Sequence, residues 1–247
     1  MERAPVMDRK LLDEAHGEKM DLEEIRHFFD VRADSWDTTA IPDPAVIREI
    51  FAEALPPGAG RVLDVACGTG VLVPFYRQAA FHTIVGVDLS PRMIARAKAK
   101  FQASPEGSAN RANQAPSSSA EPAASLTFLC ADVESLHFQP DFDLCMIYNA
   151  LPHFRNFERL FRKLRDCLRS GGRLCVAHGR ARAAINATHH SGAGQVSQDL
   201  PPVGELAGLA AHAGFRVRTQ RSSDRYYLLV AEKCEAWDSG SDRYPVR

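Results

Sequence analysis

The chain alternates short β-rich runs with longer runs of helical periodicity. The first five β-rich runs are residues 61–66, 83–88, 126–131, 142–148 and 173–177. Strands that alternate with helices form a parallel sheet covered on both faces, and right-handed crossovers give it a doubly wound order. Two further runs, 215–220 and 226–231, have no helix between them and predict a hairpin. We therefore predict an α/β, Rossmann-like, doubly wound sheet of seven strands, mostly parallel, with one antiparallel strand near the C-terminus.

Composition divides the rest of the chain into segments. Residues 102–125 are rich in Ser, Ala, Pro and Asn and contain almost no large apolar side chains, which predicts a disordered surface insertion. Helical spacing begins at Asp21, a residue suited to an N-cap. The predicted organisation is a loose polar leader, an N-terminal helical lid, the α/β domain with its insertion, and a C-terminal tail, over residues 1–20, 21–42, 43–232 and 233–247.

Charge and cysteine content narrow the function classes. The 247 residues carry a net charge of −1, which gives no global attraction to nucleic acid or anionic membranes. No apolar run reaches the roughly 18–20 residues that span a bilayer, and the first twenty residues lack a secretory signal. The six cysteines are scattered without a C-x-x-C pair, so a structural zinc site is not expected. These features favour a cytoplasmic protein without metal, nucleic-acid or membrane partners.

A glycine turn follows the first predicted strand, at the edge where open α/β sheets bind ligands. Gly68 and Gly70 let the backbone approach a ligand closely, and the helix that follows favours a ligand carboxylate at its N-terminus. Asp64, within the strand, could accept a hydrogen bond from a ligand ammonium group. Asp88 ends the second strand, where a carboxylate can bind both hydroxyls of a ribose and would repel a 2′-phosphate.

The turn lacks the third small residue of the dinucleotide-binding fingerprint. That fingerprint requires G-x-G-x-x-G or G-x-G-x-x-A, whereas the chain reads GTGVLV at 68–73. Close packing around a pyrophosphate is therefore not supported. An NAD-dependent oxidoreductase on a related fold stays open as the less favoured alternative.

Several segments, in the expected order, resemble the motifs of class I S-adenosylmethionine (SAM)-dependent methyltransferases of the small-molecule type. They are VLDVACGTG at 62–70, VGVDLSPRMIARAK at 85–98, ADVESLHF at 131–138, FDLCMIYNALPHF at 142–154 and LRSGGRLCVA at 168–177. The resemblance implies a SAM-dependent methyltransferase domain over residues 43–232. The segment FFDVRADSWD at 28–37 also resembles the N-terminal lid of small-molecule methyltransferases, whose aromatic residues could close over cofactor and acceptor.

The resemblance also implies which residues hold the cofactor. Asp64, Gly68 and Gly70 would line the methionine part of SAM, and Asp88 would bind the ribose hydroxyls. Asn149 would lie under the cofactor at the end of the fourth strand.

The adenine end of the cofactor is assigned in the same way. Leu89 and Met93 would pack near the adenine. Asp132 would accept a hydrogen bond from the adenine amino group, with Val133 beside it.

His153 and His178 follow the fourth and fifth strands at the ligand edge and are the candidate catalytic residues. Methyl transfer would be a direct in-line displacement that yields S-adenosylhomocysteine, so alignment and exclusion of water could supply most of the acceleration. A general base is needed only if the acceptor must lose a proton. Each histidine could instead cap a helix or be solvated. Together with His189 and His190 they leave a metal-activated acceptor open, although no ligand spacing supports one.

The expected function is methyl transfer from SAM to a small-molecule nucleophile, an oxygen, nitrogen, carbon or sulfur atom, by a monomer or homodimer. Besides the oxidoreductase, a non-catalytic SAM-binding protein stays open. A nucleic-acid methyltransferase is disfavoured by the neutral charge and because NALP at 149–152 does not match an Asn-Pro-Pro-aromatic or Asp-Pro-Pro-aromatic tetrad. Arg180 and Arg182 could hold an acidic acceptor or be solvated.

Overall fold

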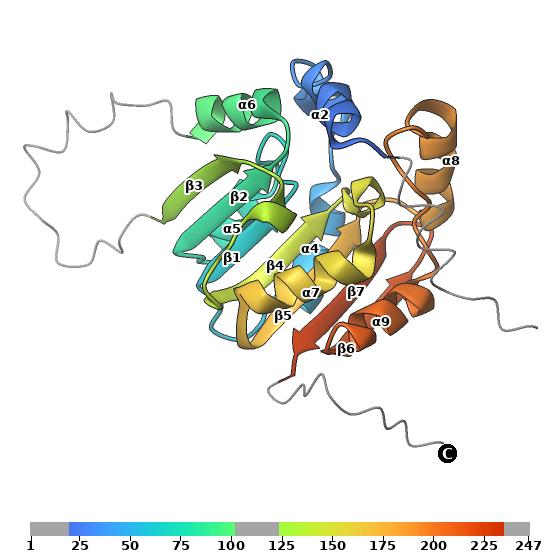
Figure 1. Cartoon of the computed structure of the whole chain (residues 1–247). Helices are drawn as coiled ribbons and strands as arrows, with labels where there is room; N and C mark the ends of the chain where they lie inside the picture. Colours follow the sequence, from blue (N-terminus) through green and yellow to red (C-terminus); the bar gives the residue numbers. More distant parts are fainter. Residues whose placement is uncertain (1–19, 102–123, 235–247) are drawn as a thin grey trace, which may run out of the picture.

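The computed structural model describes residues 20–101 and 124–234, which contain a seven-stranded sheet (Figure 1). The strand order is β3-β2-β1-β4-β5-β7-β6. The strands are β1 Arg61–Val65, β2 Thr83–Asp88, β3 Ser125–Cys130, β4 Phe142–Tyr148, β5 Leu168–His178, β6 Phe215–Ser222 and β7 Tyr227–Lys233. Neighbours from β3 to β5 pair in parallel, whereas β7 runs antiparallel to both β5 and β6. The predicted fold class is confirmed, with the antiparallel strand inserted between two others.

Helices cover both faces of this sheet. They are α2 Leu22–Asp30, α3 Trp36–Thr39, α4 Pro44–Ala54, α5 Val73–Gln78, α6 Pro91–Phe101, α7 Phe157–Cys167, α8 Arg182–Gly192 and α9 Val203–His212. One hydrophobic core joins α7 and α9 to one face, and a second joins α4 and α5 to the other. In Figure 1, α2 lies above the sheet beside α6. None of the helices in the described ranges has the length and apolar character needed to cross a bilayer.

Local sequence explains where the lid and the first core helix begin. The Asp21 carboxylate accepts a hydrogen bond from the Glu23 amide at 2.7 Å, which caps α2 as the sequence predicts. Asp43 caps α4 in the same way, and Pro44 occupies the first helical position. Met20, at the end of the predicted leader, is buried and packs with Ile25.

Two elements begin away from the place that the sequence suggests. The helix expected after the glycine turn begins only at Val73, because residues 70–72 complete the turn that leaves β1. The fifth strand begins at Leu168 rather than 173, because Leu168 already pairs with Phe142 and the intervening residues form an irregularity in the strand. Gly172 allows this close approach, since a Cβ there would lie 2.9 Å from the Phe142 carbonyl oxygen.

Parts of the predicted leader, insertion and tail lie outside the described residues. These are residues 1–19, 102–123 and 235–247. The last residue of the predicted insertion, Ser125, is the first residue of β3.

A buried carboxylate near the start of β4 ties the central strands together. Asp143 is 6% exposed, and one of its oxygens accepts hydrogen bonds from the amides of Gly60 at 2.7 Å and Arg61 at 2.6 Å. The other oxygen forms an ion pair with Arg169. Asp143 therefore connects the entrance of β1 to β4 and β5.

Replacing Asp143 should destabilise the sheet. Asp143→Ala leaves two buried amides without acceptors, so we expect the free energy of unfolding to fall by about 3 kcal/mol in urea denaturation. Asp141→Ala is the matched control, because Asp141 is exposed and pairs only with Arg61, and it should cost less than about 1 kcal/mol. Equal losses in both variants would contradict this account.

Candidate functional site

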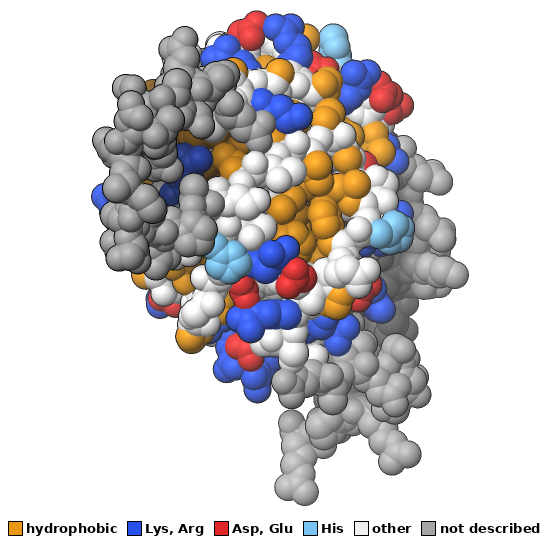
Figure 2. All heavy atoms as spheres, turned by 90° about the vertical axis from the view of Figure 1, so that its left-hand side faces the viewer, with side chains coloured by type: hydrophobic (Ala, Val, Ile, Leu, Met, Phe, Trp, Pro, Cys, Tyr) orange, Lys and Arg blue, Asp and Glu red, His pale blue; other side chains and the backbone are white. Residues whose placement is uncertain are grey.

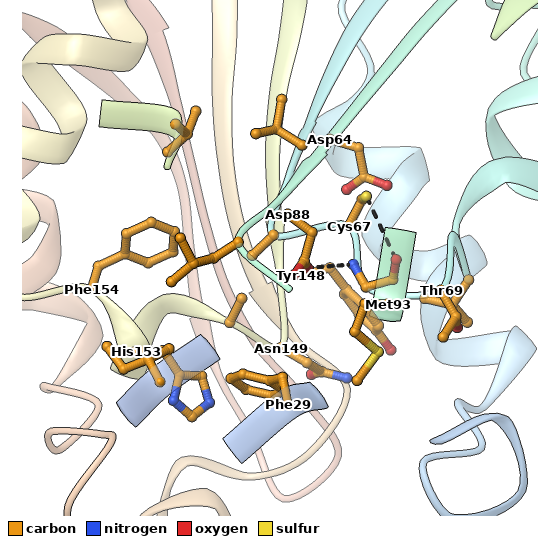
Figure 3. A pocket seen from close by; sticks show the side chains of 18 of the residues that line it. Phe29, Asp64, Cys67, Thr69, Asp88, Met93, Tyr148, Asn149, His153 and Phe154 are labelled. Carbon is orange, nitrogen blue, oxygen red and sulfur yellow. Dashed lines mark hydrogen bonds between the residues drawn. The ribbon is translucent and has the colours of Figure 1, made fainter. Parts of the chain in front are cut away.

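A pocket lies at the carboxyl ends of β1, β2 and β4, beneath the lid helices α2 and α3 (Figure 3). The residues that the lid and the segment before α4 contribute to it are Leu22, Ile25, Phe29, Trp36, Asp37, Ala40 and Pro42. In the close-up, Asp64 and Thr69 lie on the opposite side of the pocket from His153 and Phe154. The pocket is thus enclosed by the sheet edge on one side and by apolar lid side chains on the other.

Asp88 fixes the glycine turn to the end of β2. One carboxylate oxygen accepts a hydrogen bond from the Gly68 amide at 2.8 Å, and the other accepts one from the Ser90 amide at 2.8 Å. The Cys67 amide adds a hydrogen bond to the Val87 carbonyl at 3.0 Å. Gly68 has a φ of 55°, in the left-handed region that favours glycine. Asp88 therefore shapes the loop in addition to lining the pocket.

Gly70 has a structural part in this turn. Its φ is 80°, and a Cβ there would lie 2.9 Å from the Phe101 ring and 3.3 Å from the Phe128 ring. Gly70 does not line the pocket, in contrast to Gly68. The structure therefore places Gly70 behind the loop, where it permits α6 and β3 to approach.

A buried acid, Asp64, and a half-buried acid, Asp88, lie in the pocket. Asp64 is 3% exposed, and burial raises its pKa to about 8, with the nearby Asp88 carboxylate raising it further. Burial likewise raises the pKa of Asp88 to about 6. Neither acid forms an ion pair with a residue in the described ranges, so a ligand cation would favour the ionised form of both.

The remaining predicted cofactor residues all line the same pocket. Leu89, Met93 and Val133 form an apolar wall, and Asp132 lies next to it, where its side chain accepts a hydrogen bond from the Glu134 amide at 3.0 Å. Asn149 has a φ of 55°, and its side-chain oxygen accepts a hydrogen bond from the Gly179 amide at 2.9 Å.

His153 lines the pocket, and a hydrogen bond defines its tautomer. Its Nδ1 lies 2.8 Å from the Val196 carbonyl oxygen and therefore carries the proton, which leaves the Nε2 lone pair free. The lid residue Phe29 packs edge-on against the imidazole, with ring centroids 4.9 Å apart. Burial lowers the pKa of His153 to about 4, so the ring is neutral at pH 7.

His178 lies outside this pocket. It ends β5 and is 2% exposed, and its ring stands edge-on to Tyr227 with centroids 6.1 Å apart. Burial lowers the pKa of His178 to about 3. Its position at the strand end suggested a catalytic base, but strand position does not reveal which sheet face a side chain occupies.

The structure adds functional residues that sequence reasoning passed over. Thr69, between the two glycines, is buried and lines the pocket, and Asp37 of α3 lines it as well. The lid was recognisable from its aromatic residues, but no local pattern indicates that Asp37 reaches a loop 32 residues away.

Metal ligation finds no support in the described ranges. No group of three or more His, Cys, Asp or Glu side chains there is arranged to hold an ion. The rings of His153 and His189 lie 5.3 Å apart, while His190 pairs with Asp199 at 2.6 Å on the surface.

Comparison with known proteins relates part of the chain to methyltransferases. Residues 63–176 match the family model described as a methyltransferase domain. The chain is 37% identical over 91 residues to human methyltransferase-like protein 27, a match that covers 34% of this chain and only 37% of that relative.

Solved structures share the fold. One is a chain of the Haloferax volcanii complex between the Trm112 methyltransferase activator and a putative methyltransferase. Its TM-score is 0.66 at 16% identity, and the match covers 87% of this chain and 99% of that one. Another is a SAM-dependent methyltransferase from Mesorhizobium loti. Its TM-score is 0.55 at 21% identity, and the match covers 77% of this chain and 96% of that one.

The fold and the strand order are those of SAM-dependent methyltransferases of known structure. The segment that matches the methyltransferase domain model contains the glycine turn and the pocket residues Asp64 and Asp88, so SAM is the ligand to compare with the pocket. The pocket residues fit that molecule, because Asp64 and Asp88 suit its sulfonium, ammonium and ribose groups and the apolar wall suits its adenine.

Replacing Asp88 should weaken cofactor binding strongly. Asp88→Ala removes a pocket carboxylate and both hydrogen bonds that shape the loop, so we expect the dissociation constant of S-adenosylhomocysteine to rise at least about 30-fold in isothermal titration calorimetry. Asp199→Ala, which removes an exposed acid, should leave the affinity unchanged. Unaltered binding by the Asp88 variant would exclude this carboxylate from the cofactor site.

Cofactor binding should release a proton from Asp64. Because its pKa is about 8, Asp64 is largely protonated at pH 7, and a ligand cation favours the ionised form. Affinity should therefore rise between pH 6 and pH 8. Calorimetry in buffers of different ionisation enthalpy should show close to one proton released at pH 7, and Asp64→Asn should abolish it. The same release from the Asn variant would assign the proton to another group.

Proposed function

We propose that this protein transfers the methyl group of SAM to a small-molecule nucleophile by direct in-line displacement. The observation that carries the proposal is a pocket that holds two acids without ion-pair partners among the described residues, Asp64 and Asp88, together with a neutral histidine, His153, whose Nδ1–H is held by a carbonyl. Bound SAM supplies an electrophilic methyl group on a positively charged sulfur. The residues of the chain must orient this group and the acceptor and must exclude water.

The enclosure of the pocket supports a small acceptor. Leu22, Ile25, Phe29 and Trp36 of the lid line the pocket and cover the sheet edge. These side chains are apolar, so they exclude water from the space in front of His153. Exclusion of water strengthens the electrostatic interactions of the carboxylates with a cation.

His153 is suited to hold the acceptor. Its Nδ1–H is fixed by the Val196 carbonyl, so Nε2 can accept a hydrogen bond from a hydroxyl, thiol or amine of the acceptor. A pKa of about 4 keeps the ring neutral and available at pH 7. We assign the acceptor contact to His153 and none to His178, which has no access to the pocket.

The decisive experiment identifies the methylated product. The protein is incubated with methyl-labelled SAM and fractionated cell metabolites, and labelled products are sought by mass spectrometry. Transfer to a small molecule supports the proposal. Binding of SAM without any transfer would favour a non-catalytic SAM-binding protein, and binding of NAD without SAM would favour an oxidoreductase.

Removal of the His153 imidazole should slow methyl transfer strongly and should weaken cofactor binding only slightly. With the labelled metabolite fraction as acceptor, His153→Ala should reduce the rate about 100-fold while the affinity for S-adenosylhomocysteine changes less than about threefold. His190→Ala is the control, because His190 is exposed and faces Asp199. Equal rates in the His153 variant and the wild type would remove this residue from the reaction.

A further inference from the structure

The lid touches the glycine turn through two consecutive residues. The Thr69 hydroxyl donates a hydrogen bond to Asp37 Oδ1 at 2.5 Å, and the indole nitrogen of Trp36 lies 3.8 Å from the place that a Cβ on Gly68 would occupy. Asp37 and Trp36 belong to α3, whereas Gly68 and Thr69 belong to the loop after β1. The cofactor loop and the lid therefore share a direct contact.

A lysine from a third element completes this contact. Lys100 Nζ, near the end of α6, donates to both Asp37 oxygens at 3.0 Å. Burial alone would raise the pKa of Asp37, but hydrogen bonds from Thr69 and Lys100 outweigh it and keep the pKa below its usual value. Asp37 is therefore charged throughout the neutral range, and a charged acceptor forms the stronger hydrogen bond with Thr69.

Two other acids of the lid, Asp30 and Asp34, contact α6 and the residue before it. Asp30 accepts hydrogen bonds from the Ser90 hydroxyl at 2.6 Å and the Arg92 amide at 3.3 Å. Asp34, which is largely exposed, pairs with Arg92 at 2.5 Å and Arg96 at 3.6 Å. In Figure 2, acidic and basic side chains lie side by side at the top of the molecule. In Figure 1, α2 and α6 lie at the same height. Among the lid acids, only Asp37 reaches the glycine loop in the described part of the chain.

The loop needs such support because of its composition. Gly68 and Gly70 both adopt positive φ, and glycine has more conformational freedom to lose than any other residue. Thr69 is the one residue between them with a side chain, and that side chain is 1% exposed. The Thr69 hydroxyl donates its hydrogen bond to the lid, so the lid adds to the hold that Asp88 has on the loop.

We propose that Asp37 is a positioning residue that acts through Thr69 to hold the cofactor loop, so that lid closure and cofactor retention are one event. Asp37 and Trp36 also line the pocket, so α3 covers part of the space in which the cofactor would lie. Lifting α3 breaks the Thr69 hydrogen bond and leaves the loop held by Asp88 and Val87 alone in the described part of the chain. The inference rests on the proposed function only for the location of the cofactor, and it adds the residue that couples the lid to that site.

A double-mutant cycle with S-adenosylhomocysteine tests the coupling. Asp37→Ala and Thr69→Val should each raise the dissociation constant about tenfold, with most of the change in the dissociation rate. Because both variants remove the same contact, the double variant should also be about tenfold weaker rather than about a hundredfold. Asp34→Ala is the matched control on the same lid and should change the affinity less than about threefold.

Amide hydrogen exchange measures the stability of the loop in the protein without cofactor. Asp37→Ala should raise amide exchange across residues 67–72 of the free protein, whereas Asp34→Ala should not. Asp37→Asn keeps an acceptor for Thr69 but loses the charge, so it should restore most of the loop protection and show a weaker salt dependence than the wild type. Thermal unfolding of each variant identifies any general loss of fold.

Failure of the coupling and failure of cofactor binding would give different results. Wild-type affinity in the Asp37→Ala variant, unchanged loop exchange, or a double variant about a hundredfold weaker would each overturn the coupling while leaving the site intact. A wild-type protein that fails to bind S-adenosylhomocysteine would overturn both the proposed function and this inference.

Discussion

The hydrogen bonds of the Asp88 carboxylate determine the geometry of the whole ligand edge. One carboxylate oxygen holds the Gly68 amide after β1, and the other holds the Ser90 amide at the start of α6. Two neighbouring strands therefore end in a fixed relation to one another, at the point where the sheet order reverses between β1 and β4. The pocket, the lid contact and the placement of Met93 all follow from this junction, since each depends on where the loop and α6 begin.

The electrostatics of the pocket are divided between its two sides. Asp64 and Asp88 have no compensating cation among the described residues, and desolvation raises the pKa of both. His153, on the other side, is kept neutral by burial and by its hydrogen bond to Val196. A positively charged group is therefore favoured on one side and a neutral hydrogen-bond donor on the other, which is the polarity that a sulfonium cofactor and an uncharged nucleophile require.

Most of the fold could be predicted from the sequence because its information is local. Strand runs, helix caps such as Asp43 and the glycine turn each carry their own signal, and right-handed crossovers then leave few topologies. The residues proposed to hold the cofactor came largely from the resemblance to methyltransferase motifs, and all except Gly70 line one pocket because strand ends converge on one edge. What could not be predicted depends on contacts between distant residues. The Val196 carbonyl that orients His153 is 43 residues away, and the burial of His178 depends on a strand that follows it much later in the chain.

The position of β7 has a consequence for how the domain is assembled during synthesis. β7 comprises residues 227–233, the last element described, yet it pairs on both sides, with β5 and with β6. Until those residues leave the ribosome, the outer side of β5 has no neighbour, and an unpaired apolar strand edge invites association with other chains. Completion of the sheet must therefore wait for nearly the whole domain to be translated, so the nascent chain depends on protection of β5 during that interval.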